Sequence, residues 1–424
     1  MTSPIYSKIK NFLFYNKTGN QTVVKNAFWL TVAEVFDKGV AFLCVVGIAR
    51  HFGSNLFGEW TVALSLVSIF AILPDFGFAS LTVREVAKDK TKTASYIDNI
   101  LLMKAVLSVF AFLAIVITAN LMGKEGRVLV LVYFLAIYVI INSFSNFFRS
   151  VFLANEKMQY DAAARIIQNL VLLTLVAVFI FTDMPIAVMC YAYIIAPIAG
   201  IAFSFGYIWR SFSKFLNKID FRFCKEILLE AWPFALSGIF MALYGQVDVL
   251  ILSSVKSYSS VGWYDAANRL TSNLAVFPSI LMGALYPRLS IFYAESKDGF
   301  KKIYKKVLRY VFLLCVIMFP LLLIFSKWII LLLYGSTYSN SIIVFRILLL
   351  SSLFTFFSYV FAYILFSIKK QFVYTLIIIF CLTFNVILSL IFVPRFSYIG
   401  VSWVLVLSQF LQALLLFLAT KRYL

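Results

Sequence analysis

The chain of 424 residues is poor in the residue types on which many enzyme and metal sites depend, since it has one histidine and five cysteines. The histidine, His51, follows a long apolar run, and no pair of cysteines has the spacing of metal ligands. The sequence also lacks a glycine-rich phosphate loop and a nucleophile elbow. We therefore expect a protein that is not an enzyme, with no catalytic residues, no metal and no organic cofactor.

Charge is scarce as well: 13% of the residues are charged and 63% are apolar. A soluble domain is nearer a quarter charged and half apolar. The apolar residues gather in long runs, and a helix needs about 20 such residues to cross a bilayer. We therefore predict an all-α integral membrane protein with about 12 transmembrane helices. The predicted spans are 26–50, 57–80, 98–122, 128–153, 163–182, 185–209, 231–253, 268–290, 307–326, 343–367, 371–393 and 398–420.

The distribution of basic residues predicts how these spans are oriented. Lys and Arg concentrate before the first span, in every second connection and after the last span, whereas the alternate connections hold few of them. Because short basic loops stay in the cytoplasm, both termini are predicted to be cytoplasmic. Topology then accounts for the net charge of +19, and we expect no nucleic acid partner.

The stretch 210–230 divides the predicted spans into six and six, and it carries five basic and three acidic residues. It is predicted to be a cytoplasmic linker between two six-helix lobes, 26–209 and 231–424. Both lobes would have the same orientation, as in transporters built from parallel repeats. Residues 1–25 are predicted to be a cytoplasmic segment, in which residues 4–14 form either a short interfacial helix or a frayed basic tail.

Among the charged residues of the predicted spans, seven are singled out as lying inside the membrane. Each would cost about 2.5–3.5 kcal/mol at the centre of a span that faced lipid. These side chains should therefore face a wet cavity or pair with one another. They are Glu34, Asp37, Lys38, Lys104, Asp248, Arg269 and Arg346.

Basic residues in and beside the spans are the candidates for binding an anionic substrate, because the planar guanidinium of Arg forms bidentate hydrogen bonds with phosphate. For the arginines among them, which lie near span ends, snorkelling to lipid head groups is the alternative. The candidate substrate-binding residues are Lys38, Lys104, Arg149, Arg165, Arg269 and Arg346.

Three acidic residues have two possible roles. Glu34 and Asp37 share one helix face with Lys38, because the spacings are three and four residues. They are either a coupling site for H⁺ or Na⁺ or static charge partners of Lys38. Asp248 is either part of such a coupling site or a partner of Arg269.

Several short motifs occur in an order and spacing that resemble a known family. They are Gly47–Gly53, Phe57–Trp60, Asp75–Gly77, Asn155–Tyr160, Trp232–Phe234, Val261–Leu270 and Leu333–Gly335. Together they resemble Wzx-type flippases of O-antigen and capsule repeat units, which belong to the multidrug/oligosaccharidyl-lipid/polysaccharide (MOP) exporter superfamily.

The resemblance implies two lobes around a central cationic cavity. It also implies movement of undecaprenyl-pyrophosphate-linked oligosaccharide from the cytoplasmic to the periplasmic leaflet by alternating access, in a bacterial or other prokaryotic plasma membrane. The pyrophosphate would meet Lys38, Lys104, Arg149 and Arg269. A polysaccharide polymerase with its chain-length machinery is an implied partner.

Two other functions fit parts of the pattern. A multidrug cation exporter of the same superfamily also has a carboxylate in its first helix, here Glu34 or Asp37. A drug-cation site should be net acidic, however, whereas the seven charges within spans comprise four basic and three acidic residues. A membrane polysaccharide polymerase or ligase typically has large outer loops, and the predicted outer loops are short.

Overall fold

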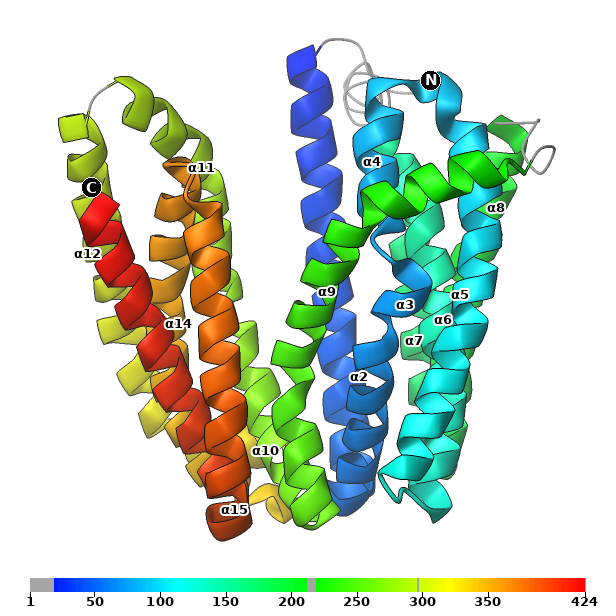
Figure 1. Ribbon diagram of the computed structural model, residues 1–424. Helices are drawn as coiled ribbons and strands as arrows, with labels where there is room; N and C mark the ends of the chain where they lie inside the picture. Colours follow the sequence, from blue (N-terminus) through cyan, green and yellow to red (C-terminus); the bar gives the residue numbers. More distant parts are fainter. Residues whose placement is uncertain (1–18, 212–218, 296, 424) are drawn as a thin grey trace, which may run out of the picture. The chain divides into compact units, whose positions relative to one another are not determined.

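The structure is a computed structural model, and it describes residues 19–211, 219–295 and 297–423. The described residues form α-helices and two short 3-10 helices (Figure 1). The predicted interfacial helix at residues 4–14 lies outside them. The helices are α2 (Gly19–Phe70), α3 (Ile72–Asp75), α4 (Phe78–Lys88), η1 (Lys90–Lys92), α5 (Thr93–Leu121), α6 (Gly126–Ala154), α7 (Met158–Phe181), α8 (Ile186–Ser211), α9 (Phe221–Val255), α10 (Tyr258–Asn273), α11 (Val276–Glu295), α12 (Lys297–Ile324), α13 (Ser326–Tyr334), η2 (Ser336–Tyr338), α14 (Ser341–Ser367) and α15 (Gln371–Tyr423).

The all-α membrane fold predicted from the sequence is confirmed. Nine helical stretches among the described residues are long and apolar enough to cross a membrane. Two of them contain a break in the helical backbone, at Gly53 in α2 and at Ser397 in α15. Each break separates two predicted spans, and the α10–α11 pair covers one more. The observed helices therefore agree with about twelve spans.

Two predicted spans differ from the observed helices. The span 57–80 is interrupted between α3 and α4, where Phe76 and Gly77 both have left-handed backbone angles, φ 46° and 79°. A Cβ atom on Gly77 would lie 2.4 Å from the Cβ atom of Phe234 in α9, so glycine permits both this conformation and the close packing. The span 268–290 is two helices, which begin ten residues earlier at Tyr258.

The chain forms two compact units, and a short segment of the first helix belongs to the second unit. Unit 1 contains residues 1–51 and 63–246, and unit 2 contains residues 52–62 and 247–424. This division lies within α9, whereas the sequence placed a linker at 210–230. Part of that linker is helical because the carboxylate of Asp220 accepts hydrogen bonds from the backbone N–H groups of Arg222 and Phe223, at 2.9 and 3.3 Å, and so caps α9.

Contacts within unit 1 explain why the first part of α9 belongs to it. The rings of Phe223 and Tyr96 meet edge to face with centroids 5.1 Å apart. The guanidinium of Arg84 lies 2.7 Å from the carboxylate of Glu230. The start of α9 thus packs on α4 and α5, and it shares with them and with α6 and α8 a core that includes Phe152.

The cores of the two units differ in their central helices. In unit 1 the buried apolar cluster lies among α4, α5, α6, α8 and the start of α9. In unit 2 the largely buried α14 packs against α10, α11, α12, α13 and α15. Apolar side chains on the outer helix faces are exposed, as expected where lipid is the solvent.

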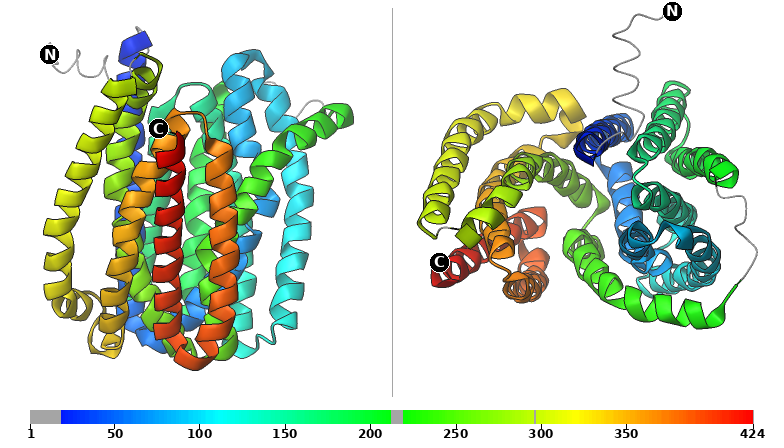
Figure 2. Two further views of the ribbon diagram at one scale, coloured as in Figure 1. Left: turned by 60° about the vertical axis from the view of Figure 1, so that its left-hand side comes forward. Right: turned by 90° about the horizontal axis from the view of Figure 1, so that it is seen from above.

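In each unit the connections predicted to be cytoplasmic lie at one end. In unit 1, Lys90 of η1 lies 3.0 Å from Glu156 of the α6–α7 connection, and Lys25 near the start of α2 donates to Gln159 over 3.3 Å. In unit 2, the start of α12, the α14–α15 connection and the end of α15 share one end (Figures 1 and 2). This is the arrangement that the predicted topology requires within each unit.

Unit 2 contains a close crossing of two helix segments at glycine. A Cβ atom on Gly58 would lie 1.8 Å from the carbonyl oxygen of Tyr258, and one on Gly262 would lie 2.1 Å from that of Ser54. Small residues let membrane helices approach closely where burial of apolar surface from water gives no driving force. The crossing explains why a glycine occurs in each of these two sequence motifs.

We expect Gly58→Ala to lower the free energy of unfolding by about 1–3 kcal/mol, because the added methyl group would overlap a backbone carbonyl. Thermal unfolding of the purified protein in detergent measures the effect. Gly206→Ala is the matched control, since Gly206 lies in α8 with nothing within 4 Å of the added carbon. Equal stability of the two variants would contradict a tight crossing at Gly58.

Candidate functional site

The charged face predicted on the first helix is part of a polar network in unit 1. The ammonium of Lys38 lies 3.3 Å from the carboxylate of Glu34, and both side chains are about half exposed, at 48% and 52%. The carboxylate of Asp37 accepts a hydrogen bond of 2.8 Å from the side chain of Asn169 in α7. The predicted pairing of Glu34 with Lys38 is therefore present, and Asp37 has an amide partner.

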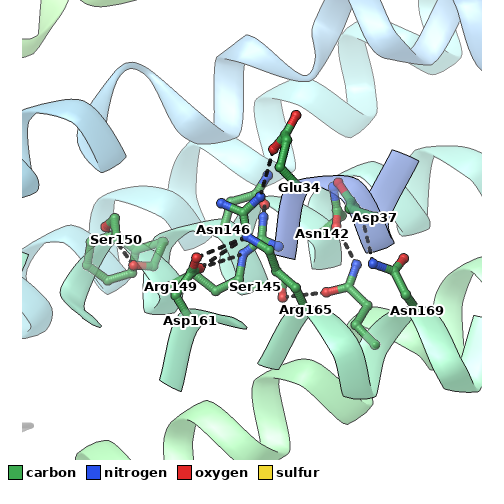
Figure 3. A network of polar contacts seen from close by, with 12 residues as sticks. Glu34, Asp37, Asn142, Ser145, Asn146, Arg149, Ser150, Asp161, Arg165 and Asn169 are labelled. Atoms are coloured by element: carbon green, nitrogen blue, oxygen red, sulfur yellow. Dashed lines mark hydrogen bonds and ion pairs between the residues drawn. The ribbon is translucent and has the colours of Figure 1, made fainter. Parts of the chain in front are cut away.

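Two arginines share one buried carboxylate at the centre of this network (Figure 3). The Nε atom of Arg165 lies 3.1 Å from Asp161 Oδ2, and the Nε atom of Arg149 lies 3.8 Å from Asp161 Oδ1. The side chain of Asp161 is fully buried, whereas those of Arg149 and Arg165 retain 15% and 18% of their exposure. Two positive charges therefore face one negative charge at this point.

Further polar contacts fix the outer edges of the two guanidinium groups. Arg149 Nη2 donates a hydrogen bond to the side-chain oxygen of Asn146, one helical turn earlier in α6. Arg165 Nη1 lies 3.4 Å from Glu34 Oε2, so Glu34 contacts both Lys38 and Arg165. Helices α2, α6 and α7 thus contribute one connected set of charges.

The two arginines line a cavity of about 370 Å³ in unit 1. Ser80, Asn146 and Ser150 supply further polar groups, and among the described residues that line the cavity the charged ones are both arginines. A cavity with this lining can bind an anion through guanidinium N–H groups.

A second cavity of about 270 Å³ shares Asn146 with the first. Its polar lining includes Asp75, Tyr138, Asn142 and Ser143. These amide, hydroxyl and carboxylate groups can both donate and accept hydrogen bonds, as binding of a hydroxyl-rich ligand requires.

Lys104 contacts two residues that line the second cavity, Ser143 and Asp75. Its fully buried ammonium donates hydrogen bonds to the hydroxyl of Ser143 over 2.6 Å and to the carbonyl of Pro74 over 2.7 Å. It also lies 3.7 Å from the carboxylate of Asp75. Lys104 therefore anchors the interrupted helix at α3, and its direct contact with a substrate remains a prediction.

The predicted sites in unit 2 form separate groups. The Nε atom of Arg269 lies 2.6 Å from Asp265 Oδ2, which also accepts a hydrogen bond of 3.0 Å from Thr61. The buried Asp248 accepts hydrogen bonds of 3.3 Å from the hydroxyls of Tyr264 and Ser389.

The suggested Asp248–Arg269 pair is thus replaced by a closer pair within one helix. Asp265 lies four residues before Arg269, on the same face of α10. The exposed Arg346 of α14 donates a hydrogen bond of 2.8 Å to Ser326.

The structure brings together Glu34, Lys38, Arg149 and Arg165 of the predicted site, with Asp37 bonded through Asn169 nearby. The sequence reasoning missed the acidic partners Asp161, Asp265 and Asp75. Their signal was present, because Asp161 and Asp265 each precede an arginine by four residues. Asp161 was passed over because the predicted span began at residue 163.

No group of His, Cys, Asp and Glu side chains with the arrangement of a metal site occurs in the part of the chain that the structure describes. The five cysteines, all buried, are free thiols. The charged and amide side chains of the unit 1 network can bind a ligand through ion pairs and hydrogen bonds.

Comparison with protein families gives two matches. The family described as "Polysaccharide biosynthesis protein" matches residues 23–293, and the family "MatE" matches residues 233–391. The first match covers more than half of the chain and includes every residue of the unit 1 network.

Two curated relatives and one solved structure illustrate the similarity. A Shigella flexneri protein named "Putative O-antigen transporter" is 22% identical over 78% of this chain and 82% of its own length. A Haloferax volcanii protein named "Probable low-salt glycan biosynthesis flippase Agl15" is 20% identical over 65% of this chain and 57% of its own. The solved structure "Lipid II flippase MurJ, inward closed conformation" has a TM-score of 0.71 at 16% identity, covering 92% of this chain and 87% of that one.

The structural likeness shows a shared fold, and the family match extends from the first span to α11. The resemblance seen in the sequence motifs is therefore confirmed. The chain belongs to the polysaccharide biosynthesis protein family of membrane proteins.

Proposed function

We propose that this protein is a flippase that moves oligosaccharide repeat units linked to undecaprenyl pyrophosphate between membrane leaflets. The observation that carries the proposal is the cavity lined by Arg149 and Arg165, which share the single buried carboxylate of Asp161. The names of the relatives in O-antigen transport and glycan biosynthesis support this substrate class.

The geometry suits a pyrophosphate. Asp161 holds both arginines through their Nε edges, which keeps the guanidinium planes at the cavity wall. The guanidinium groups of Arg149 and Arg165 line the cavity. Charge-assisted hydrogen bonds from such groups to phosphate are among the strong ones in proteins. The polar second cavity, which begins at Asn146, would receive sugar hydroxyls.

Glu34 has a specific role in this mechanism. It is about half exposed and lies 3.4 Å from Arg165, so its carboxylate occupies a position that a phosphate oxygen would take. The arriving pyrophosphate would displace Glu34 from Arg165, and Lys38 would retain the released carboxylate. Glu34 thus competes with the substrate and keeps binding reversible.

A drug-cation exporter is less compatible with this site. Among the described residues that line the arginine cavity, none is a carboxylate, and Asp75 in the second cavity lies beside the buried ammonium of Lys104. Coupling to H⁺ or Na⁺ is a further part of the proposal, with Glu34, Asp37 and Asp248 as the candidate residues.

We expect Arg149→Gln/Arg165→Gln to reduce flipping at least tenfold, because removing two charge-assisted hydrogen bonds of about 1.5–3 kcal/mol each weakens pyrophosphate binding. The measurement is the leaflet distribution of the lipid-linked repeat unit in cells whose only flippase is this protein. The double substitution also removes both partners of Asp161, so protein amount and thermal unfolding are measured in parallel.

Arg127→Gln is the control, because Arg127 is exposed in the first turn of α6. Normal flipping by the folded double variant would contradict the arginine site. An unchanged leaflet distribution in cells that lack the protein altogether would contradict the flippase function itself.

A second prediction follows from competition by Glu34. We expect Glu34→Gln to bind inorganic pyrophosphate about two- to fivefold more tightly, since exposed ion pairs contribute about 0.2–1 kcal/mol. Isothermal titration of the purified protein measures the dissociation constant. Glu125→Gln, a change at an exposed residue of the α5–α6 connection, is the control. Weaker binding by Glu34→Gln would mean that Glu34 positions Arg165 and does not compete with the ligand.

The third prediction concerns orientation. We propose that both termini are cytoplasmic in a bacterial inner membrane, because the basic connections require it. A reporter domain that works only in the cytoplasm should be active when fused at residue 1 or at residue 424. A reporter that works only in the periplasm should be inactive at both ends. Periplasmic activity at one end would require an odd number of spans, and activity at both ends would invert the orientation.

A further inference from the structure

The first half of α12 carries four basic side chains on one helix face in unit 2. Lys302, Lys305, Lys306 and Arg309 are spaced by three and four residues, which places them in adjacent turns of the same face. Together with Tyr310 they line a cavity of about 350 Å³, and all four are exposed.

These cations differ from those of unit 1 in their acidic partners among the residues whose side chains the structure describes. Within the described part of the chain, none of the four lies within salt-bridge distance of a carboxylate, whereas Lys38 and Arg165 each do. The ammonium of Lys306 lies 5.8 Å from the ring centroid of Tyr310. Four adjacent positive charges attract an anion to this cavity.

The same helix face continues into an apolar strip. Leu313, Val316 and Ile317 follow Arg309 by four, seven and eight residues, and their exposed fractions are 47%, 51% and 64%. In a helix that crosses the membrane, such side chains contact lipid tails. Tyr310 lies where the basic and apolar parts meet, a position typical of tyrosine at the membrane interface.

We propose that this face of α12 is a binding site for an anionic phospholipid. The head group would lie among Lys302, Lys305, Lys306 and Arg309, and the acyl chains would lie along the strip that begins at Leu313. A phospholipid fits better than a soluble anion because the cations and the exposed apolar strip form one continuous face. Clusters of Lys and Arg beside a transmembrane helix attract anionic lipids of the cytoplasmic leaflet, toward which this end of α12 is predicted to face. The site is separate from the arginine cavity of unit 1 and does not rest on the proposed function.

Native mass spectrometry of the full chain in detergent tests the proposal. Cardiolipin, phosphatidylglycerol or phosphatidylcholine is added, and retention of one lipid per chain is measured. We expect retention of the anionic lipids and loss of phosphatidylcholine. In the variant Lys302→Gln/Lys305→Gln/Lys306→Gln/Arg309→Gln, affinity for the anionic lipids should fall by roughly fivefold for each charge removed.

A control variant removes the same net charge elsewhere on the predicted cytoplasmic side. It is Lys88→Gln/Lys90→Gln/Lys92→Gln/Lys225→Gln, and it should retain anionic lipid as the unmodified chain does. Equal loss of anionic lipid from both variants would mean that net charge alone determines binding, and it would overturn the site. Equal retention in both, or equal binding of phosphatidylcholine, would also overturn it.

A variant with two substitutions tests the site even if the fourfold variant misfolds or inserts in the inverted orientation. Lys305→Gln/Arg309→Gln should weaken anionic lipid binding roughly 25-fold. The increase in thermal unfolding temperature produced by cardiolipin should shrink accordingly. An unchanged increase would contradict the site.

Competition experiments distinguish a phospholipid from a soluble phosphate and from a polyprenyl diphosphate as the bound anion. Glycerol 3-phosphate carries a phosphate without acyl chains and should not displace the bound lipid. If it does so at similar concentration, the apolar strip contributes nothing and a phospholipid site is excluded. If a polyprenyl diphosphate displaces cardiolipin at a lower concentration, the face binds the transported lipid class and the phospholipid proposal fails.

Discussion

The structure depends on how positive charge is compensated inside the membrane. A charge facing lipid at the centre of a span costs about 2.5–3.5 kcal/mol, so each cation of a span needs an oxygen partner. Lys38, Lys104 and Arg269 each lie beside a carboxylate, those of Glu34, Asp75 and Asp265. Arg149 and Arg165 differ because they share one, Asp161, within 4 Å of both Nε atoms. Arg165 has Glu34 as a further partner, and both arginines line a cavity wall, where an anion can bind.

The break in the second predicted span depends on the same need for polar partners, here for backbone carbonyl groups. A break in a membrane helix exposes carbonyl groups that need donors, and it is tolerated where protein groups supply them. Lys104 donates to the carbonyl of Pro74 just before the left-handed residues Phe76 and Gly77. The buried ammonium therefore stabilises the break and the carboxylate of Asp75 together. This explains how a fully buried lysine can be part of a stable core.

The sequence predicted the helices better than it predicted which side chains contact one another. Long apolar runs and basic connections identified nearly all helices, because hydropathy and charge act along the chain. The start of α9 was missed, although Asp220 before an apolar helix is a cap signal, because charge alone suggested a linker. The pairing of Asp37 with Asn169 joins residues 132 positions apart and could not be predicted from spacing. By contrast, Asp161 and Asp265 could have been found from the four-residue spacing to arginine, which defines one helix face.

Both units contain an aspartate four residues before an arginine, yet the surroundings give the two pairs different electrostatics. Asp265 pairs with Arg269 and accepts a hydrogen bond from the neutral Thr61, so that site is balanced. Asp161 instead faces a second arginine, and the balancing carboxylate is that of Glu34 in α2, which lies 3.4 Å from Arg165. A transporter must release what it binds, and the proposed pyrophosphate substrate would dissociate slowly from two arginines that had no competing carboxylate. A carboxylate from the same protein, half exposed and retained by Lys38, lowers the net gain on binding and gives Arg165 a partner after release. Under the proposed function, the acidic and basic residues of this face act as one exchange system, in which the substrate replaces an internal anion.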